Sequence, residues 1–308
     1  QYAAANGTVH IHFTVSPEHL AGFRALLARA VPEYSARYGV KYDITMSNQS
    51  TSTDTIAVNP DNTPFRTDDG RLLFRPAGHG ALIENLNNID ADIVFIKNID
   101  NVTTDELRGD TIKYKHVLAG LLLSLQARAF EYLNNFVAYD LNEIRTFIKN
   151  DLCVRTSDDT PAEMLRQILN RPIRVCGMIK NIGAPGGGPF WVRDEHGTES
   201  LQIVESSQIA PDARDIMNAS SHFNPVDLVC GTHDAHGKPF DLTAFVDHKA
   251  GFISEKSYGG HALRAMERPG LWNGAMAHWN TVFVAVPAST FTPVKVVTDL
   301  LSSSHGAK

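Results

Sequence analysis

The chain has 308 residues, a formal net charge of −6, and a composition of 43% hydrophobic and 20% charged residues. This composition excludes a disordered, collagenous or coiled-coil protein, and the acidic balance argues against a dedicated nucleic-acid surface. No apolar run approaches the roughly 18 residues of a membrane span. The three cysteines lack C-x-x-C spacing, which is typical of buried thiols in a protein of the reducing cytoplasm.

The N-terminal part predicts a strand, a helix and a second strand. Residues 8–15 alternate in polarity and are rich in β-forming side chains, which predicts a strand. Ser16 and the proline after it then open a helix with an apolar stripe. Residues 42–46 predict the next strand, and the polar residues 47–55 form a loop at its carboxyl end. This order indicates a βαβ crossover and a parallel sheet.

The stretch 74–102 combines a glycine loop, a short helix, a strand and an acidic turn. Gly78 and Gly80 allow the backbone to approach a flat ligand closely. Residues 92–96 (DIVFI) predict a buried strand, and Asp100 follows it. Because ligands of open α/β sheets bind outside the carboxyl ends of strands, this carboxylate is well placed to hold a metal or a sugar. A tight loop and an Asx turn are the structural alternatives.

The remaining elements predict a three-layer α/β fold: a mostly parallel mixed sheet with helices on both faces, and a smaller mixed β region in the second half. We find no repeat and no linker, so a single domain over 1–308 is expected. The glycine-rich residues 184–189 (APGGGP) predict a mobile connection. Helices are expected over 114–150 and about 161–169, and strands over 174–179, 190–193, 201–205, 223–229 and the end of 271–286.

Common catalytic motifs are absent from the sequence. His233 and His236 form the densest histidine cluster, but the surrounding glycines and proline indicate a turn and there is no H-E-x-x-H helix for zinc. A G-x-S-x-G nucleophile elbow and a phosphate-binding G-x-x-x-x-G-K-[ST] loop are missing as well.

What remains is a set of polar residues and glycines at the ends of the predicted strands. Each could serve the fold alone, for example in a turn or a cap. The candidates are Gln49, Gly78, His79, Gly80, Asp100, Asn101, Glu205, Asn273 and Lys295.

The order of these residues resembles the UDP-sugar pyrophosphorylases, especially UDP-N-acetylhexosamine pyrophosphorylase, and an uncharacterised bacterial domain family of the GT-A nucleotidyltransferase clan. HIHFTVSPEH is similar to the family's second strand. DGRLLFRPAGHGALIENL is similar to its uridine loop, KNIDNV to its V-D-N strand end, and IVESSQI to its V-E-Y-S-E sugar motif. GLWNGAMAHWNTVF and VPASTFTPVKVV resemble two later segments. The six segments span nearly the whole chain in the family's order.

The resemblance implies a role for each matched position. Asp100 would hold Mg²⁺ or the nucleotide phosphates, and Lys295 would neutralise charge during transfer. Glu205 would bind sugar hydroxyls. The remaining implied positions are Gln49, Gly78, His79, Gly80 and Asn101 for the nucleotide, and Gly177, Asn273 and Gly274 for the sugar.

Several departures from the family pattern bear on the substrate. Ser206 replaces the tyrosine of the sugar motif, Gln208 its second glutamate, and Met276 an isoleucine. The family's first strand and its phosphate-cradling glycine loop would precede Gln1, and because the chain starts without Met, we expect an N-terminally incomplete domain.

These observations predict a cytoplasmic nucleotidyltransferase-like protein that forms a UDP-sugar and pyrophosphate from UTP and a sugar 1-phosphate with Mg²⁺. A non-catalytic sugar-nucleotide-binding protein is the alternative. The expected partners are small molecules, without nucleic acid or membrane. The identity of the base and of the sugar and the oligomeric state stay open.

Overall fold

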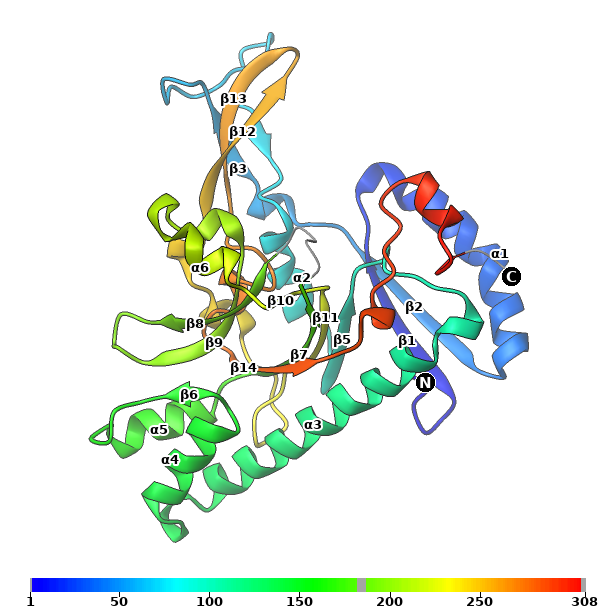
Figure 1. The fold of residues 1–308 in the computed structure, drawn as a ribbon. Coiled ribbons are helices and arrows are strands. Elements are labelled where there is room, and N and C mark those ends of the chain that lie inside the picture. The colour runs from blue at the N-terminus through cyan, green and yellow to red at the C-terminus, as the bar shows by residue number, and fades with distance from the viewer. Residues whose placement is uncertain (1, 182–186, 306–308) are drawn as a thin grey trace. The chain divides into compact units, whose positions relative to one another are not determined.

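The computed structural model describes residues 2–181 and 187–305 (Figure 1). The chain forms two compact units. The first comprises Gln1–Ile89 and His248–Leu271, and the second comprises Asp90–Asp247 and Trp272–Lys308. Residues 184–186 of the predicted loop 184–189 lie outside the described residues, and residues 188–189 are not a connection but the start of a strand.

The first unit begins with the predicted βαβ crossover. Strands β1 (Thr8–Thr14) and β2 (Lys41–Ser47) pair in parallel along their whole length, joined by α1 (Leu20–Tyr38). The helix ends at Gly39, which adopts the left-handed conformation that glycine tolerates (φ 64°). The sequence-based prediction of this crossover is confirmed.

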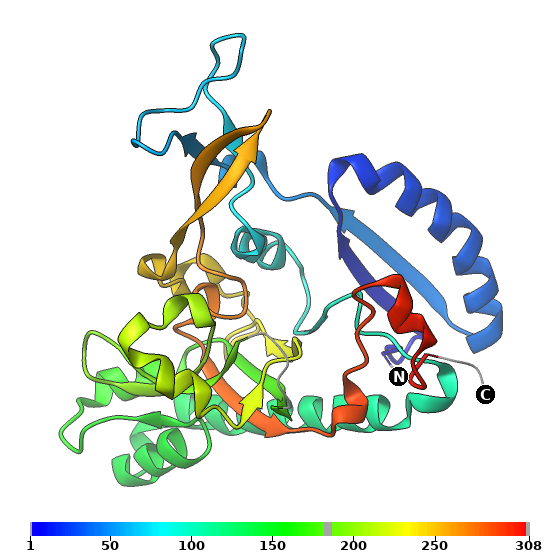
Figure 2. The ribbon, with the colours of Figure 1, turned by 45° about the horizontal axis from the view of Figure 1, so that its top comes forward.

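The other sheet of the first unit joins two segments that are far apart in the sequence, residues 55–75 and 252–267. Its strands occur in the order β12-β13-β3-β4, and all neighbours are antiparallel. Figure 2 shows the orange β12–β13 hairpin beside the blue β3. A small core beneath it contains Ala57, Phe65, Leu263 and Ala265. The elements are β3 (Thr55–Val58), β4 (Phe74–Arg75), the short helix α2 (Leu82–Asn87), β12 (Phe252–Tyr258) and β13 (His261–Glu267).

The second unit contains a five-stranded mixed sheet. Its order is β10-β7-β11-β5, with β14 parallel to β7. Because β11 is antiparallel to both of its neighbours, β5 and β7 run in the same direction as β14. The strands are β5 (Ile93–Lys97), β7 (Ile173–Lys180), β10 (His222–Phe223), β11 (Asp227–Gly231) and β14 (Asn280–Ala285).

The α/β class with a mixed sheet is thus confirmed, but antiparallel pairs outnumber parallel ones among the described strands of this sheet. The cause is β11, which inserts between β5 and β7 in the opposite direction.

The helical layer of the second unit packs on one face of this sheet. The predicted helix 114–150 is two helices, α3 (Gly109–Asn134) and α4 (Leu141–Asn150), because Asp140 caps a new helix by accepting a hydrogen bond from Asn142 N at 2.8 Å. α5 (Ala162–Leu169) lies where it was predicted. Apolar side chains of these helices and of β7, β11 and β14 form the main core.

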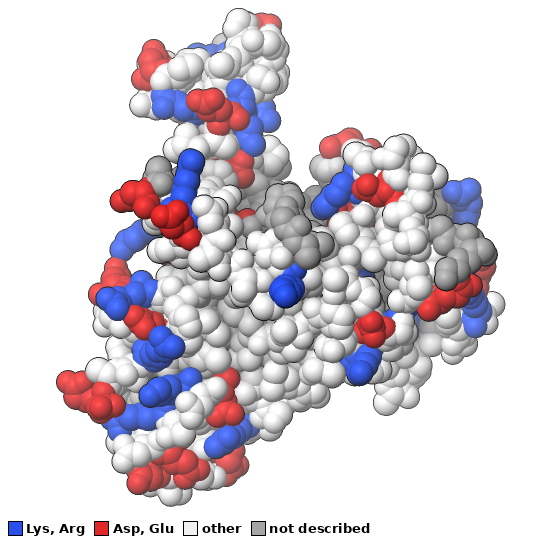
Figure 3. Space-filling model, in the orientation of Figure 1, with Lys and Arg blue, Asp and Glu red and all other residues white. Residues whose placement is uncertain are grey.

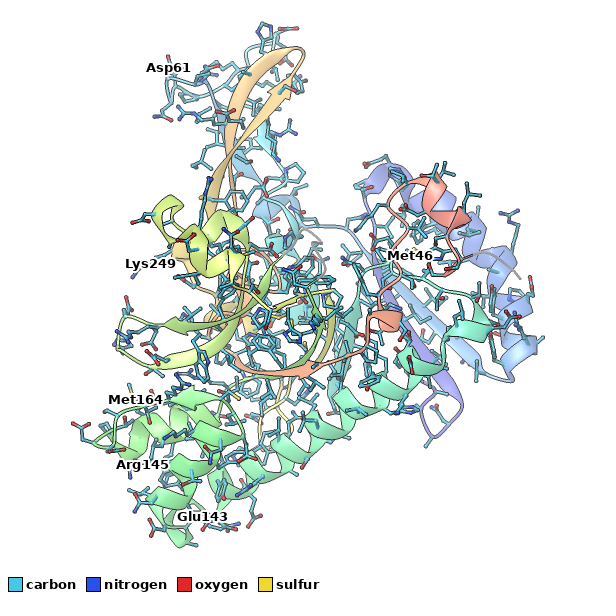
Figure 4. The ribbon with its side chains drawn as sticks, viewed as in Figure 1. Met46, Asp61, Glu143, Arg145, Met164 and Lys249 are labelled. Carbon is cyan, nitrogen blue, oxygen red and sulfur yellow. The ribbon has the colours of Figure 1, made fainter. Side chains whose placement is uncertain are left out.

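Polar side chains fix α4 in this layer, and its residues Glu143 and Arg145 are seen in Figure 4. The Tyr132 hydroxyl on α3 donates to Glu143 Oε1 at 2.9 Å, and Arg145 Nη2 donates to Thr160 O at 2.9 Å. On the face shown in Figure 3, acidic and basic side chains alternate over the region of α4, α5 and the hairpin of residues 188–204. Among the described residues, no helix is long and apolar enough to cross a membrane.

The smaller β region of the second half is confirmed as a three-stranded antiparallel sheet, β6-β9-β8. Asp194 closes the predicted hairpin turn by accepting backbone hydrogen bonds from His196 and Thr198, both at 2.9 Å. The elements are β6 (Val154–Arg155), β8 (Gly188–Arg193), β9 (Glu199–Val204) and, after them, α6 (Arg214–Asn218).

Candidate functional site

The carboxyl ends of β5, β7 and β14 lie at one edge of the five-stranded sheet, since the three strands run in the same direction. Asp100 follows β5, Lys295 lies ten residues after the end of β14, and Gly177 lies within β7. Two segments that are far apart in the sequence therefore bring predicted site residues to the same edge, where open α/β sheets bind their ligands.

Asp100 and Lys295 are in direct contact. Lys295 Nζ donates to Asp100 Oδ2 and forms an ion pair with it, although 195 residues separate them. The backbones run side by side at this point, because Val294 N donates to Asp100 O at 2.9 Å. The side chain of Lys295 is 64% exposed and that of Asp100 25% exposed, so both can be reached by a ligand.

Asn101 holds these two segments together. Its side chain is 2% exposed. Thr292 N donates to Asn101 Oδ1 at 3.0 Å, and Asn101 Nδ2 donates to Thr290 O at 3.2 Å. Both ends of the amide are thus used to fix the segment that carries Lys295 beside the turn that carries Asp100.

The predicted sugar residues Glu205 and Asn273 meet in a second cluster, which we call the Glu205 cluster and which also contains Gln208 and Trp272. Trp272 Nε1 donates to Glu205 Oε1 at 3.1 Å, and Asn273 Nδ2 donates to Gln208 Oε1 at 2.8 Å. Gln208 Oε1 also accepts from Glu205 N at 2.8 Å, which closes a capping box. Asn273 is 6% exposed, and its Oδ1 has no hydrogen-bond partner among the described residues. It is a buried acceptor that a ligand donor could satisfy.

Close packing explains Gly177, one of the two glycines predicted for the sugar. A Cβ atom on Gly177 would lie 3.3 Å from both methyl groups of Val286. Gly274 begins a short 3₁₀ helix (Gly274–Met276), and its carbonyl accepts from Asp247 N at 2.9 Å. Sequence reasoning missed Gly187, whose Cβ would lie 2.8 Å from Glu205 Oε1.

The first unit contains the predicted glycine loop. Gly78 adopts φ 77°, which favours glycine. A Cβ atom on Gly80 would lie 1.9 Å from the carbonyl oxygen of Pro269, so only glycine fits there. His79 Nδ1 accepts a hydrogen bond from Leu271 N at 3.0 Å, which places the proton of the neutral imidazole on Nε2.

Gln49 lies after β2 in the same unit. Its Nε2 donates to Thr53 Oγ1 at 3.2 Å. The neighbouring Asn48 carbonyl accepts from Asn85 Nδ2 at 2.9 Å, which ties this loop to α2, the helix that follows the glycine loop. The remaining predicted site residues belong to the second unit.

The family model described as a domain of unknown function, DUF4301, matches residues 1–306. The chain belongs to the DUF4301 family. No curated protein matches this DUF4301 chain.

Solved UDP-glucose pyrophosphorylases are similar to the DUF4301 chain in structure. A variant of the Leishmania major enzyme has 16% identity and a TM-score of 0.48, covering 96% of this chain and 54% of that one. A second variant of that enzyme, in complex with UDP-glucose, has 15% identity and a TM-score of 0.46, with the same coverage. The UDP-glucose phosphorylase of Trypanosoma brucei has 14% identity and a TM-score of 0.45, covering 96% and 53%. The DUF4301 chain spans about half the length of these proteins.

The histidine cluster of the DUF4301 chain is the predicted turn. His233 pairs with Pro239 across it, and Asp234 Oδ1 accepts from His236 N at 2.8 Å and Lys238 N at 2.9 Å. In the part of the chain that the structure describes, no three His, Cys, Asp or Glu side chains are grouped to hold a metal. Asp100 alone still suits Mg²⁺, which binds through one or two carboxylates together with substrate phosphates.

The glycine loop of this DUF4301 chain is expected to weaken in acid. Burial lowers the pKa of His79 from 6.5, although the nearby Glu267 acts to raise it. The unfolded chain therefore binds a proton more readily, and stability falls as the pH drops below about 6.5 and through the lower folded pKa.

His79→Asn places an acceptor oxygen close to the position of Nδ1 but removes the titration. Melting temperatures measured between pH 7 and pH 5 should fall less steeply in this variant than in the wild type. Because the two proteins differ only at position 79, the difference between the two slopes isolates His79. Parallel slopes would contradict the assignment.

Proposed function

We propose that this protein is a nucleotidyltransferase that forms a UDP-sugar and pyrophosphate from UTP and a sugar 1-phosphate. The observation that carries the proposal is the contact between Asp100 and Lys295 at the carboxyl ends of parallel strands. It joins an acidic strand end to a distant lysine, the two positions to which the family resemblance assigns a role in catalysis.

The proposed reaction needs positioning and charge stabilisation rather than a covalent intermediate. An oxygen of the sugar 1-phosphate attacks the α-phosphorus of UTP, the bond to the bridging oxygen breaks, and pyrophosphate leaves. Lys295, whose side chain is largely exposed, neutralises charge on the phosphates. Mg²⁺, when bound by Asp100, supplies further positive charge to the phosphate oxygens.

The Glu205 cluster is proposed to bind the sugar. The Glu205 carboxylate accepts hydrogen bonds from hydroxyl groups, and the buried Asn273 Oδ1 accepts one more. In the first unit, the backbone of the Gly78–Gly80 loop and Gln49 are proposed to bind the nucleotide base. We also propose a cytoplasmic location, in keeping with three cysteines that form no disulfide.

The test is release of pyrophosphate from UTP and a panel of sugar 1-phosphates in the presence of Mg²⁺. Asp100→Asn is expected to lower kcat by about 10²-fold or more, because it removes a charge that acts on the reacting phosphates. The fold should be kept, since the Asp100 side chain is at the surface.

The matched control is Asp151→Asn. Asp151 is also partly exposed and pairs with a basic residue, Arg128, but lies outside the proposed site. Equal losses of activity in the two variants would show that Asp100 has no special role. If the wild type releases no pyrophosphate with any sugar 1-phosphate tested, the transferase proposal is rejected.

A sugar-nucleotide-binding protein without transfer activity is the second candidate. It is favoured by the Glu205 cluster, in which Gln208 stands where the family has a second carboxylate and is engaged by Asn273. A bound UDP-sugar at about a hundred times its Kd should raise the free energy of unfolding by about 2.7 kcal/mol, while no pyrophosphate is released from UTP.

A further inference from the structure

Arg174 is a charged residue in the middle of the five-stranded sheet. It lies on β7 and is fully buried, with 0% of its surface exposed. In the sequence it interrupts an otherwise apolar strand, and no motif explains it. Its burial lowers the pKa of the guanidinium, because the charged form loses water.

The guanidinium is held by neutral groups. Nε donates to Thr281 Oγ1 at 2.8 Å, and Nη2 donates to Gln202 Oε1 at 2.9 Å. Nη1 donates to Trp272 O at 2.5 Å and contacts Met276 Sδ at 3.3 Å. None of these acceptors is a carboxylate. A buried cation without a carboxylate partner is costly, and an apolar side chain of similar volume would avoid that cost.

The positions of the acceptors indicate what the charge is for. In the sequence, Trp272 and Met276 flank Asn273, and both are contacted by Nη1 of Arg174. The other donors, Nε and Nη2, bind Thr281 on β14 and Gln202 on β9. Arg174 donates a hydrogen bond to the backbone carbonyl of Trp272, and the indole of the same residue donates to Glu205. Arg174 therefore connects the sheet to the Glu205 cluster through a single residue.

We propose that Arg174 is a positioning residue that fixes the segment 272–276, so that Trp272 meets Glu205 and Asn273 meets Gln208. The buried Asn273 Oδ1 is then held ready to accept a hydrogen bond from the ligand. This inference rests on the proposed binding of a sugar at the Glu205 cluster. Arg174 acts through Trp272 and Met276 and does not touch the ligand.

The experiment reads the position of Trp272 in the ligand-free protein. Fluorotryptophan is incorporated, and the fluorine NMR resonance of Trp272 is assigned with Trp272→Phe. Arg174→Met is expected to shift or broaden the Trp272 resonance, because the carbonyl anchor is lost. The resonance of Trp191, which is 42% exposed and lies on β8, should not move. The same variant should weaken UDP-sugar binding by about 10- to 100-fold, the effect of misplacing a binding group.

Thr281→Val is the matched control. It removes one buried hydrogen bond of the same guanidinium but leaves the donors to Trp272 and Met276 in place. It should leave both the Trp272 resonance and the Kd for the UDP-sugar as in the wild type. An equal effect in both variants would mean that Arg174 merely supports the sheet, and would overturn the proposal.

Arg174→Lys covers the case in which the methionine variant does not fold. A single amino group cannot reach Trp272 and Thr281 together, so the Trp272 resonance should move in this variant too. A wild-type spectrum would overturn the proposal, because the charge alone would then suffice. If the wild type binds no UDP-sugar, the proposed function fails, while the spectra of the free protein still decide whether Arg174 positions Trp272.

Discussion

Replacing Lys115 by Met is expected to lower the free energy of unfolding of the second unit by about 3–5 kcal/mol. Lys115 lies on α3 with 1% of its side chain exposed, and Nζ forms an ion pair and a hydrogen bond with Asp227 Oδ1 on β11. The Asp227 side chain is 4% exposed. Removing the amine leaves the buried Asp227 carboxylate without a counter-charge. The resulting loss of folding free energy is larger than the net stabilisation that the intact pair provides.

A double substitution separates the cost of the unpaired charge from that of lost packing. Lys115→Met combined with Asp227→Leu removes both charges and should recover most of the stability, since apolar replacements of buried pairs are often close to neutral. The control is Lys113→Met, two residues earlier on the same helix and exposed, which is expected to change stability by no more than about 0.5 kcal/mol.

Urea unfolding followed by tryptophan fluorescence measures these differences. All three tryptophans, Trp191, Trp272 and Trp279, belong to the second unit, so the signal reports on the part that contains the ion pair. A Lys115→Met variant as stable as Lys113→Met would show that the pair contributes nothing to the fold.

Local patterns predict the local elements of this protein. The βαβ crossover over 8–47 and the β8–β9 hairpin follow from alternation, capping residues and turn residues, all of which lie within short windows. The hairpin of β12 and β13 was missed although Gly259 and Gly260 separate its strands, both with positive φ. Two glycines between alternating runs are a recognised hairpin signal.

Short sequence windows do not predict which strands pair when the strands are far apart in the sequence. Nothing local indicates that β11 inserts between β5 and β7 in the opposite direction, or that β13 pairs with β3. The roles of Asp100 and Lys295 were implied by the resemblance to a family, but no local pattern predicts their contact. The partners of Lys115 and Arg174 could not be predicted, because a single charged residue in an apolar segment gives no indication of which residue it contacts in the fold.

Gly80→Ala is expected to disrupt the glycine loop of the first unit. A Cβ atom there would lie 1.9 Å from Pro269 O and 2.9 Å from Arg268 O, and both contacts are with backbone. The loop cannot easily move away from residues 268–271, because two hydrogen bonds hold the two segments together. Arg268 N donates to Ala77 O at 2.9 Å, and Leu271 N donates to His79 Nδ1. Overpacking against fixed atoms costs about 1–3 kcal/mol. The proposed base-binding backbone would be displaced as well.

Gly22→Ala is the matched control, because it makes the same change in the same unit with the opposite expected sign. Gly22 lies inside α1, and a Cβ atom there meets nothing within 4 Å. Alanine should stabilise this helix by about 0.5–1 kcal/mol. Hydrogen exchange of the β3 and β13 amides measures the loss caused by Gly80→Ala, and exchange within α1 measures the gain at Gly22. If Gly80→Ala leaves the exchange of β3 and β13 unchanged, the close approach to Pro269 does not constrain the loop.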